Sequence, residues 1–245
     1  MPKSIKSNLN RDELIYDKKW AFDENVTEVF DDMLERSIPD FISMRNLVTR
    51  IIGKFSQPNS LVLDLGCSTG GAIQESVNIN TKENIKFRGV EISEPMRLKA
   101  MSKLDPQIKS GLVELVDCDL RENFPNGDYS VVLSILTVQF IPIEYRQKII
   151  SSIYKNLKID GVFIFVEKIL GDNNVGDKLI SELYYELKNQ NGYNYEQISS
   201  KRKSLEGVLV PVTSKWNEDL MKEAGFTKIQ KFWQNLNFAG WVAFK

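Results

Sequence analysis

Apolar residues recur along this chain with two different spacings, and the two spacings alternate. Short runs rich in apolar residues are typical of strands buried in a parallel sheet. They predict strands over residues 60–65, 86–91, 113–117, 129–136 and 162–166. Between these runs apolar residues fall on one helical face. These segments predict helices over residues 70–78, from Ser93 onward and over residues 143–157. The alternation predicts an α/β protein with a doubly wound, mostly parallel sheet.

Both ends of the chain depart from this alternation. Further helices are expected over residues 23–37, 44–55, 172–190, 196–205 and 217–224, with Pro39 after the first. The first two precede the sheet, and we interpret residues 172–206 as a helical cap. The last strands, over residues 228–233 and 238–244, are expected to pair antiparallel at the sheet edge, which gives seven strands.

The bulk composition bounds the domain organisation and the partners. Residues 21–245 are expected to form one domain, because a hydrophobic content of 42% is ample for a core. The polar, Lys- and Arg-bearing residues 1–20 predict a flexible tail, with a lid over the active site as the alternative. The net charge of −1 provides no basic field to attract nucleic acid, so no direct nucleic-acid contact is expected.

Rare residue types narrow the chemistry further. Cys67 and Cys118 form neither a metal-binding spacing nor a disulfide framework, so we expect a cytoplasmic protein without a metal. No apolar stretch approaches the length of a membrane span, and no membrane partner is expected. The absence of histidine excludes a histidine general base and histidine-bound metal.

The strongest candidate site follows the first predicted strand. Asp64 and Leu65 lead into Gly66-Cys67-Ser68-Thr69-Gly70-Gly71, whose small residues let the loop backbone approach a ligand. Glu91 closes the second strand, and its two oxygens can accept hydrogen bonds from both ribose hydroxyls. The alternatives are a simple tight turn and an exposed strand-end charge. Together these residues predict a nucleoside site.

Two later strand ends border the same region. Asp119 could accept a hydrogen bond from an adenine amine and Leu120 could pack on the ring, although Asp119 is also typical of a simple turn. Ser134 lies where the central strand enters its loop. In folds of this kind this position borders the reactive group of the bound ligand. The chain lacks the Pro-Pro-Tyr tetrad of enzymes that methylate DNA bases, so that activity is disfavoured.

The Asp-x-Gly-x-x-x-Gly loop resembles the S-adenosylmethionine (SAM) loop of Rossmann-like class I methyltransferases, and the chain as a whole resembles the carboxy-S-adenosyl-L-methionine synthase family. The similarity runs from about Phe22 to the C-terminus. The matching segments include Phe22-Asp23-Glu24-Asn25-Val26, Asp64-Leu65-Gly66-Cys67-Ser68, Gln139-Phe140, Glu167-Lys168, Asn191-Gly192-Tyr193 and Lys201-Arg202-Lys203-Ser204-Leu205-Glu206. The front helix and the segment around Arg202 are the most specific of these.

The resemblance implies a dimeric enzyme that converts SAM and prephenate to carboxy-SAM and phenylpyruvate, for carboxymethylation of the tRNA wobble uridine. It implies a SAM or carboxy-SAM site made of Phe41, Asp64, Gly66, Cys67, Ser68, Glu91, Ile92, Asp119, Leu120, Ser134 and Arg202. Arg202 aligns with the arginine that pairs with the added carboxylate. A guanidinium suits this role because it binds a carboxylate bidentately.

The chain differs from the family pattern at three places in this site. Phe41 stands where the family usually has Tyr, Ser134 where it has Asn, and Glu91-Ile92 where it has Asp-Asn. Two alternatives therefore stay open on the same scaffold. One is a SAM-dependent methyltransferase acting on a small molecule or on tRNA, and the other is a SAM- or carboxy-SAM-binding protein without turnover.

Overall fold

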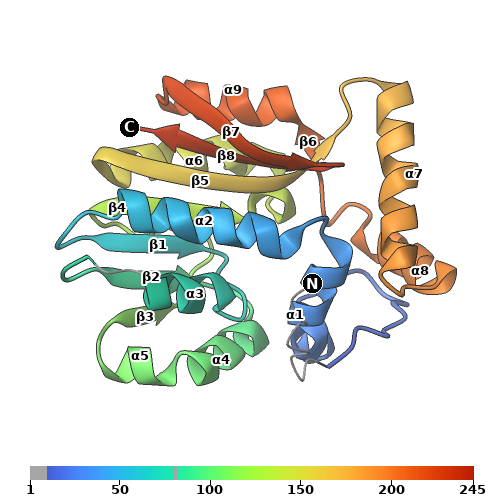
Figure 1. The fold of residues 1–245 in the computed structure, drawn as a ribbon, viewed down its shortest axis with the longest axis horizontal. Helices are drawn as coiled ribbons and strands as arrows, with labels where there is room; N and C mark the ends of the chain where they lie inside the picture. The colour runs from blue at the N-terminus through green and yellow to red at the C-terminus, as the bar shows by residue number, and fades with distance from the viewer. Residues whose placement is uncertain (1–9, 80–81) are drawn as a thin grey trace, which may run out of the picture.

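The computed structural model describes residues 10–79 and 82–245 (Figure 1). Its helices are α1 (Glu24–Ser37), α2 (Phe41–Phe55), α3 (Gly71–Ile79), α4 (Glu94–Lys103), α5 (Asp105–Lys109), the 3-10 helix η1 (Val138–Phe140), α6 (Ile143–Asn156), α7 (Asn174–Gln190), α8 (Tyr195–Leu205) and α9 (Ser214–Ala224). Its strands are β1 (Leu61–Leu65), β2 (Lys86–Val90), β3 (Val113–Val116), β4 (Tyr129–Ile135), β5 (Leu157–Leu170), β6 (Val212–Thr213), β7 (Lys228–Asn235) and β8 (Phe238–Phe244).

The strands form one sheet in the order β3-β2-β1-β4-β5-β8-β7, and the short β6 pairs with the end of β5. Strands β1 to β5 are mutually parallel, whereas β8 runs antiparallel to both β5 and β7. This arrangement confirms the predicted α/β fold of the Rossmann-like methyltransferase type. The register between β4 and β5 shifts between Tyr129 and Val131, so pairing begins at Leu157, before the predicted start of that strand.

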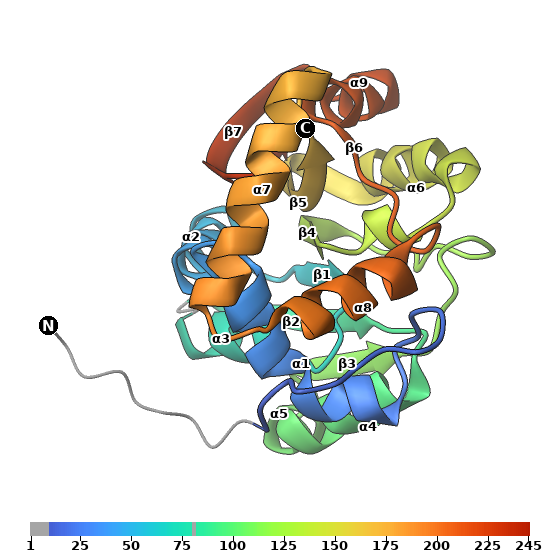
Figure 2. The ribbon, with the colours of Figure 1, turned by 90° about the vertical axis from the view of Figure 1, so that its right-hand side faces the viewer.

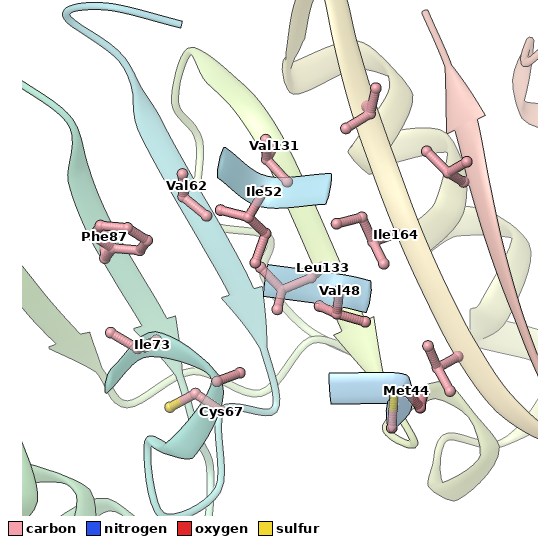
Figure 3. Close-up of a cluster of buried hydrophobic side chains, with 14 of the residues drawn as sticks. Met44, Val48, Ile52, Val62, Cys67, Ile73, Phe87, Val131, Leu133 and Ile164 are labelled. Carbon is pink, nitrogen blue, oxygen red and sulfur yellow. The ribbon is translucent and has the colours of Figure 1, made fainter. Parts of the chain in front are cut away.

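Helices cover both faces of the sheet (Figure 1). On one face, Met44, Val48 and Ile52 of α2 pack on Leu133 and Ile164 (Figure 3). On the other face, α6 and α9 contribute to a second buried cluster with Phe163 and Trp241. These two faces explain why β4 and β5 read as nearly continuous apolar runs, since both sides of each strand are buried.

The helix starts follow local sequence signals. The Asp23 side chain accepts a hydrogen bond from the Val26 N–H at the start of α1, and the Ser93 side chain caps α4 in the same way through Met96. The sequence prediction missed the short elements α5 and β6, which offer too few residues for a periodic signal. Within the described residues, no helix is long and apolar enough to cross a membrane.

Three segments lie across the carboxyl ends of the parallel strands, where Figure 2 looks onto the molecule. They are α1, α8 and the chain leading into α1. Trp20 and Phe30 pack together in a third cluster with Met33, and the backbone N–H of Trp20 donates to the Ser204 carbonyl at 2.9 Å. Helices α7 and α8 occupy the segment expected to form a cap.

Candidate active site

A cavity of about 640 Å³ opens at the carboxyl ends of the parallel strands, between the sheet and the covering segments. This volume is within the usual range for small-molecule sites. Nearly all of the predicted site residues line it: Phe41, Asp64, Gly66, Cys67, Ser68, Glu91, Ile92, Asp119 and Leu120. Ser134 and Arg202 do not. The structure thus brings residues of α2, β1 and the loops after β1, β2 and β3 together around one cavity.

The loop after β1 is held tightly against its neighbours. The N–H groups of Gly66 and Cys67 both donate to the Val90 carbonyl, at 2.8 and 2.9 Å. Gly66 has φ +72°, and a Cβ placed there would lie 2.5 Å from the side chain of Thr137. The Thr137 hydroxyl in turn donates to the Leu65 carbonyl at 2.8 Å. Glycine is therefore required here by both backbone conformation and space.

Glu91 joins the loops that follow β1 and β2. One of its carboxylate oxygens accepts from the Ser68 N–H at 2.9 Å, and the other accepts from the Ser93 N–H at 2.8 Å. Burial raises the pKa of Glu91, although these N–H groups act in the opposite direction. Each oxygen keeps a second lone pair. The arrangement can therefore orient the carboxylate for two neighbouring ligand hydroxyls while fixing the loop.

Asp64 places a second carboxyl group in the cavity wall. Only 3% of the residue is exposed, and burial raises its pKa to about 7 even though nearby Arg45 favours the charged form. Arg45 extends from α2, where its guanidinium lies 5.5 Å from the Phe41 ring centroid and 3.1 Å from the Glu75 carboxylate. A cationic ligand group beside Asp64 would compensate its charge.

The region expected to hold a purine is formed by Ile92, Asp119 and Leu120. Asp119 accepts hydrogen bonds from the Arg121 side chain and from the Arg121 N–H, each at 2.9 Å, and the Arg121 contacts lower its pKa. These bonds match the turn interpretation, while the residue still lines the cavity. Leu120 is buried and Ile92 is largely exposed at the rim.

Ser134 and Arg202 lie elsewhere. Ser134 is fully buried in the sheet, and its hydroxyl has no hydrogen-bond partner within the described residues. The later residues Ile135 and Thr137 line the cavity instead. Ile135 is still paired with Val166, but successive side chains of a strand point to opposite faces of the sheet. Arg202 is exposed, with its guanidinium 6.0 Å from the Tyr185 ring centroid. Consecutive helical residues point in different directions, so the adjacent Lys201 lines the cavity and Arg202 does not.

Aromatic residues that the sequence analysis did not assign to the site cover the cavity. The Trp20 and Phe22 ring centroids lie 5.8 Å apart, and those of Phe22 and Phe140 lie 5.0 Å apart. All three side chains line the cavity. The signal for Trp20 and Phe22 was the presence of large aromatic residues at the end of an otherwise polar N-terminal segment.

A buried ion pair anchors this N-terminal segment and corrects the expected tail. Asp12 is 1% exposed and accepts hydrogen bonds from the Tyr193 hydroxyl at 2.7 Å and from the Lys201 ammonium at 3.1 Å. Residues 12–20 therefore pack against the rest of the fold, because Tyr193 and α8 provide buried partners for Asp12 and Trp20. Of the rest of the expected tail, residues 10 and 11 are exposed, and residues 1–9 lie outside the described residues.

Glu167 fixes the loop that follows β4. Its carboxylate accepts the N–H groups of Val138 and Gln139, both at 2.9 Å, while complete burial raises its pKa to about 8. The Gln139 side chain then accepts the N–H of Lys168 at 2.8 Å. Neither Glu167 nor Lys168 was predicted as a site residue, although both fall in a segment that carried the family resemblance. Lys168 lines the cavity.

Candidate metal ligands and the buried thiol of Cys67 bear on the chemistry of the site. Within residues 10–79 and 82–245 no group of three or more His, Cys, Asp or Glu side chains is placed to hold a metal ion. The buried Cys67 has its pKa raised well above the ordinary thiol value by burial and by nearby Asp64 and Glu91.

Comparison with known proteins identifies the family. Residues 62–161 match the family described as "Methyltransferase domain". A carboxy-S-adenosyl-L-methionine synthase of Nautilia profundicola is 38% identical, with 94% of this chain and 96% of that protein covered. One from Methylococcus capsulatus is 34% identical, with 92% and 93% covered.

Solved structures agree on the fold. An O-methyltransferase family protein from Burkholderia thailandensis superposes with a TM-score of 0.65 at 15% identity, over 91% of this chain and 60% of that one. The sequence relatives are much closer and cover nearly the whole chain. The protein therefore belongs to the carboxy-S-adenosyl-L-methionine synthase family, within the superfamily of SAM-dependent methyltransferases.

Proposed function

We propose that this protein converts SAM and prephenate to carboxy-SAM and phenylpyruvate. The observation that carries the proposal is the cavity itself, which is lined by the carboxyl groups of Asp64 and Glu91 and by cations that include Lys201 of α8. Its relatives are named for the synthesis of carboxy-SAM. In this reaction prephenate loses CO2 and its ring hydroxyl and becomes phenylpyruvate. The SAM methyl group gives up a proton, which leaves with that hydroxyl as water, and the methyl carbon takes up the CO2.

The cavity wall fits SAM as a ligand. Glu91 offers a free lone pair on each oxygen for the ribose hydroxyls, and the buried Asp64 carboxyl suits the positive charges of the sulfonium and amino groups. Gly66 allows the backbone to lie close to the ligand. The aromatic cover formed by Trp20, Phe22 and Phe140 would exclude water, which protects the released CO2 and the deprotonated methyl carbon.

We assign Arg202 to the carboxylate added to SAM, and to the catalytic role of stabilising that carboxylate as it forms. Its guanidinium rests beside the Tyr185 ring outside the cavity, but its charge is close enough to depress the pKa of Lys168 in the cavity wall. A long, exposed arginine side chain can reorient toward an anion at small cost. The proposal therefore requires Arg202 to turn inward when carboxy-SAM is bound.

Turnover and ligand identity test the proposal together. The purified protein, incubated with SAM and prephenate, should release phenylpyruvate and form a product heavier than SAM by one CO2, as seen by mass spectrometry. The same measurement on protein as purified should find carboxy-SAM as a carried ligand. Phenylpyruvate that appears equally without SAM, or a ligand pool of only SAM and its demethylated form, would contradict the proposal.

The Arg202→Ala variant tests the residue assignment. We expect carboxy-SAM affinity to fall by about 10- to 100-fold, the value of a charge-assisted contact, while SAM affinity stays within about twofold. Lys203→Ala is a matched control, because Lys203 is an exposed cation on the same helix. Equal losses for both ligands in the Arg202 variant would remove Arg202 from the site.

We also propose that the protein is a homodimer. Val175, Leu179 and Leu183 are spaced by one helical turn along α7 and are 80%, 55% and 41% exposed. An exposed apolar stripe of this kind is typical of an association surface. Sedimentation velocity should show a dimer that Leu179→Glu converts to a monomer, and an unchanged dimer would place the interface elsewhere.

For the cell, we propose a cytoplasmic enzyme whose product serves carboxymethylation of the tRNA wobble uridine. Both cysteines are free thiols, which suits a reducing compartment. Mass spectrometry of tRNA nucleosides from a strain that lacks the gene should show loss of the carboxymethylated uridine. A normal modification level would refute this placement.

A further inference from the structure

Lys168 is the cation at the carboxyl end of β5. It pairs with Phe238 of β8 in the sheet register, and its ammonium lies 5.9 Å from the Phe238 ring centroid and 4.8 Å from that of Tyr184 on α7. All three residues line the cavity. The ammonium therefore lies in the cavity wall with aromatic rings around it.

The other cations of the cavity wall all have carboxylate partners. Lys201 is paired with Asp12 at 3.1 Å, Lys103 with Asp31 at 2.9 Å, Arg45 with Glu75 at 3.1 Å, and Arg121 with Asp119. Lys168 has neither an ion pair nor a side-chain hydrogen bond within residues 10–79 and 82–245. The Tyr184 and Phe238 rings offset only part of the desolvation cost of this ammonium, and a bound anion would offset the rest.

The surroundings of Lys168 make its ammonium group lose a proton more readily than an ordinary lysine does. Burial lowers its pKa to about 8. The positive charge of Arg202 on α8 also lowers this pKa, whereas the carboxylate of Asp177 on α7 acts to raise it. Lys188, also on α7, is a further cation close enough to interact with it. The Asp177 carboxylate is itself engaged by the Gly171 N–H at 2.7 Å. None of these groups provides a direct counterion.

The position of Lys168 selects the ligand. The strand order places β1 and β2, which carry Asp64 and Glu91, on one side of β4, and β5 on the other. SAM bound by Asp64 and Glu91 would lie over β1 and β2. Its methyl group would then lie between the nucleoside and Lys168. The anion at Lys168 then belongs to the second substrate, and prephenate carries two carboxylates.

We propose that Lys168 is the residue that binds a carboxylate of the oxoacid substrate, prephenate, and that it orients this substrate against the SAM methyl group. This assignment rests on the proposed function. It gives the two substrates separate charged anchors, with carboxyl groups for the cationic nucleoside and an ammonium for the anionic oxoacid.

Binding without turnover tests the assignment. Prephenate is titrated by calorimetry into protein saturated with S-adenosylhomocysteine, which lacks the reacting methyl group. For Lys168→Met we expect prephenate affinity to fall about 10- to 100-fold, as for loss of a charge-assisted hydrogen bond, with SAM affinity within about twofold. Lys168→Arg should retain prephenate binding within about threefold. The exposed Lys203→Met should bind both ligands as the unmodified protein does.

The pH dependence separates an ammonium contact from a packing role. Because the pKa of Lys168 is about 8, prephenate affinity of the unmodified protein should fall by roughly tenfold per pH unit above that value. The Lys168→Arg variant should show no such fall, because arginine stays charged.

Each outcome bears on a distinct statement. Undiminished prephenate binding by Lys168→Met, in a protein that still turns over, overturns this assignment and leaves the proposed function intact. A parallel loss of SAM binding in that variant places Lys168 on the nucleoside and also overturns it. Failure of the unmodified protein to bind or convert prephenate overturns the proposed function together with this inference.

Discussion

Replacing Gly66 with alanine tests whether the loop after β1 is held by steric necessity. The residue has φ +72°, a conformation that costs an L-amino acid about 1–2 kcal/mol. The new Cβ would also lie 2.5 Å from Thr137, and overpacking of this kind costs about 1–3 kcal/mol more. We therefore expect Gly66→Ala to lower the free energy of unfolding by about 2–5 kcal/mol.

Gly111 provides a matched control for the backbone contribution. Its φ is +73°, but a Cβ there meets no atom within 4 Å. Gly111→Ala should therefore cost only the conformational part, about 1–2 kcal/mol. The difference between the two variants isolates the contact between Gly66 and Thr137. Thr137→Ala in the Gly66→Ala background should recover part of that difference, because the two sites are coupled.

Urea denaturation followed by circular dichroism measures the free energies of unfolding, and calorimetry measures SAM affinity. We expect SAM binding to Gly66→Ala to weaken at least about tenfold, since the displaced loop carries Ser68 and its contact with Glu91. Gly111→Ala should bind SAM normally. Equal destabilisation by the two alanines, or normal SAM binding by Gly66→Ala, would refute the steric argument.

Two further predictions concern buried carboxyl groups. Burial raises the pKa of Asp64 to about 7, so the group is mostly neutral at pH 6 and mostly charged at pH 8. SAM affinity measured by calorimetry should accordingly rise about tenfold over that range, and Asp64→Asn should bind weakly with no such rise; an equal rise in the variant would contradict the role of Asp64. Asp12→Asn leaves Lys201 buried without a counterion and should cost about 3–5 kcal/mol in urea denaturation, whereas the exposed Asp17→Asn should cost under about 0.5 kcal/mol. Similar losses for the two asparagines would show that the ion pair is not what holds the N-terminal segment.

Local chemistry made most of the fold predictable. The alternation of apolar runs and amphipathic segments located the seven strands of the main sheet, and Asp23 and Ser93 begin their helices as capping residues do. The failures share a physical cause. Asp12 and Trp20 look like tail residues in sequence, because their stabilising partners, Lys201 and Ser204, lie far away along the chain. No local pattern reports such contacts.

The same reasoning applies to the candidate site. The residues that follow β1 and β2 were predictable because strand ends fix their location, and they do line the cavity. Ser134 was assigned from its place in the chain, but the next residue, Ile135, lines the cavity, because successive strand residues point to opposite faces of the sheet. For Arg202, a difference of one position along α8 decides whether a side chain faces the cavity, as Lys201 does, or solvent, as Arg202 does. The importance of Lys168 emerges only from the absence of a partner, which sequence does not reveal.

The ion pair between Asp12 and Lys201 joins residues 189 positions apart in the chain. Contacts of such high sequence separation form late, because the entropy of closing a long loop must be met first. A ribosome-bound chain could complete β1 to β4 and fold the nucleoside side of the cavity while α8 was still unsynthesised. Closure of the cavity over a ligand would then be one of the last events of biosynthesis, so a truncated chain could bind a nucleoside without being able to shield it from water.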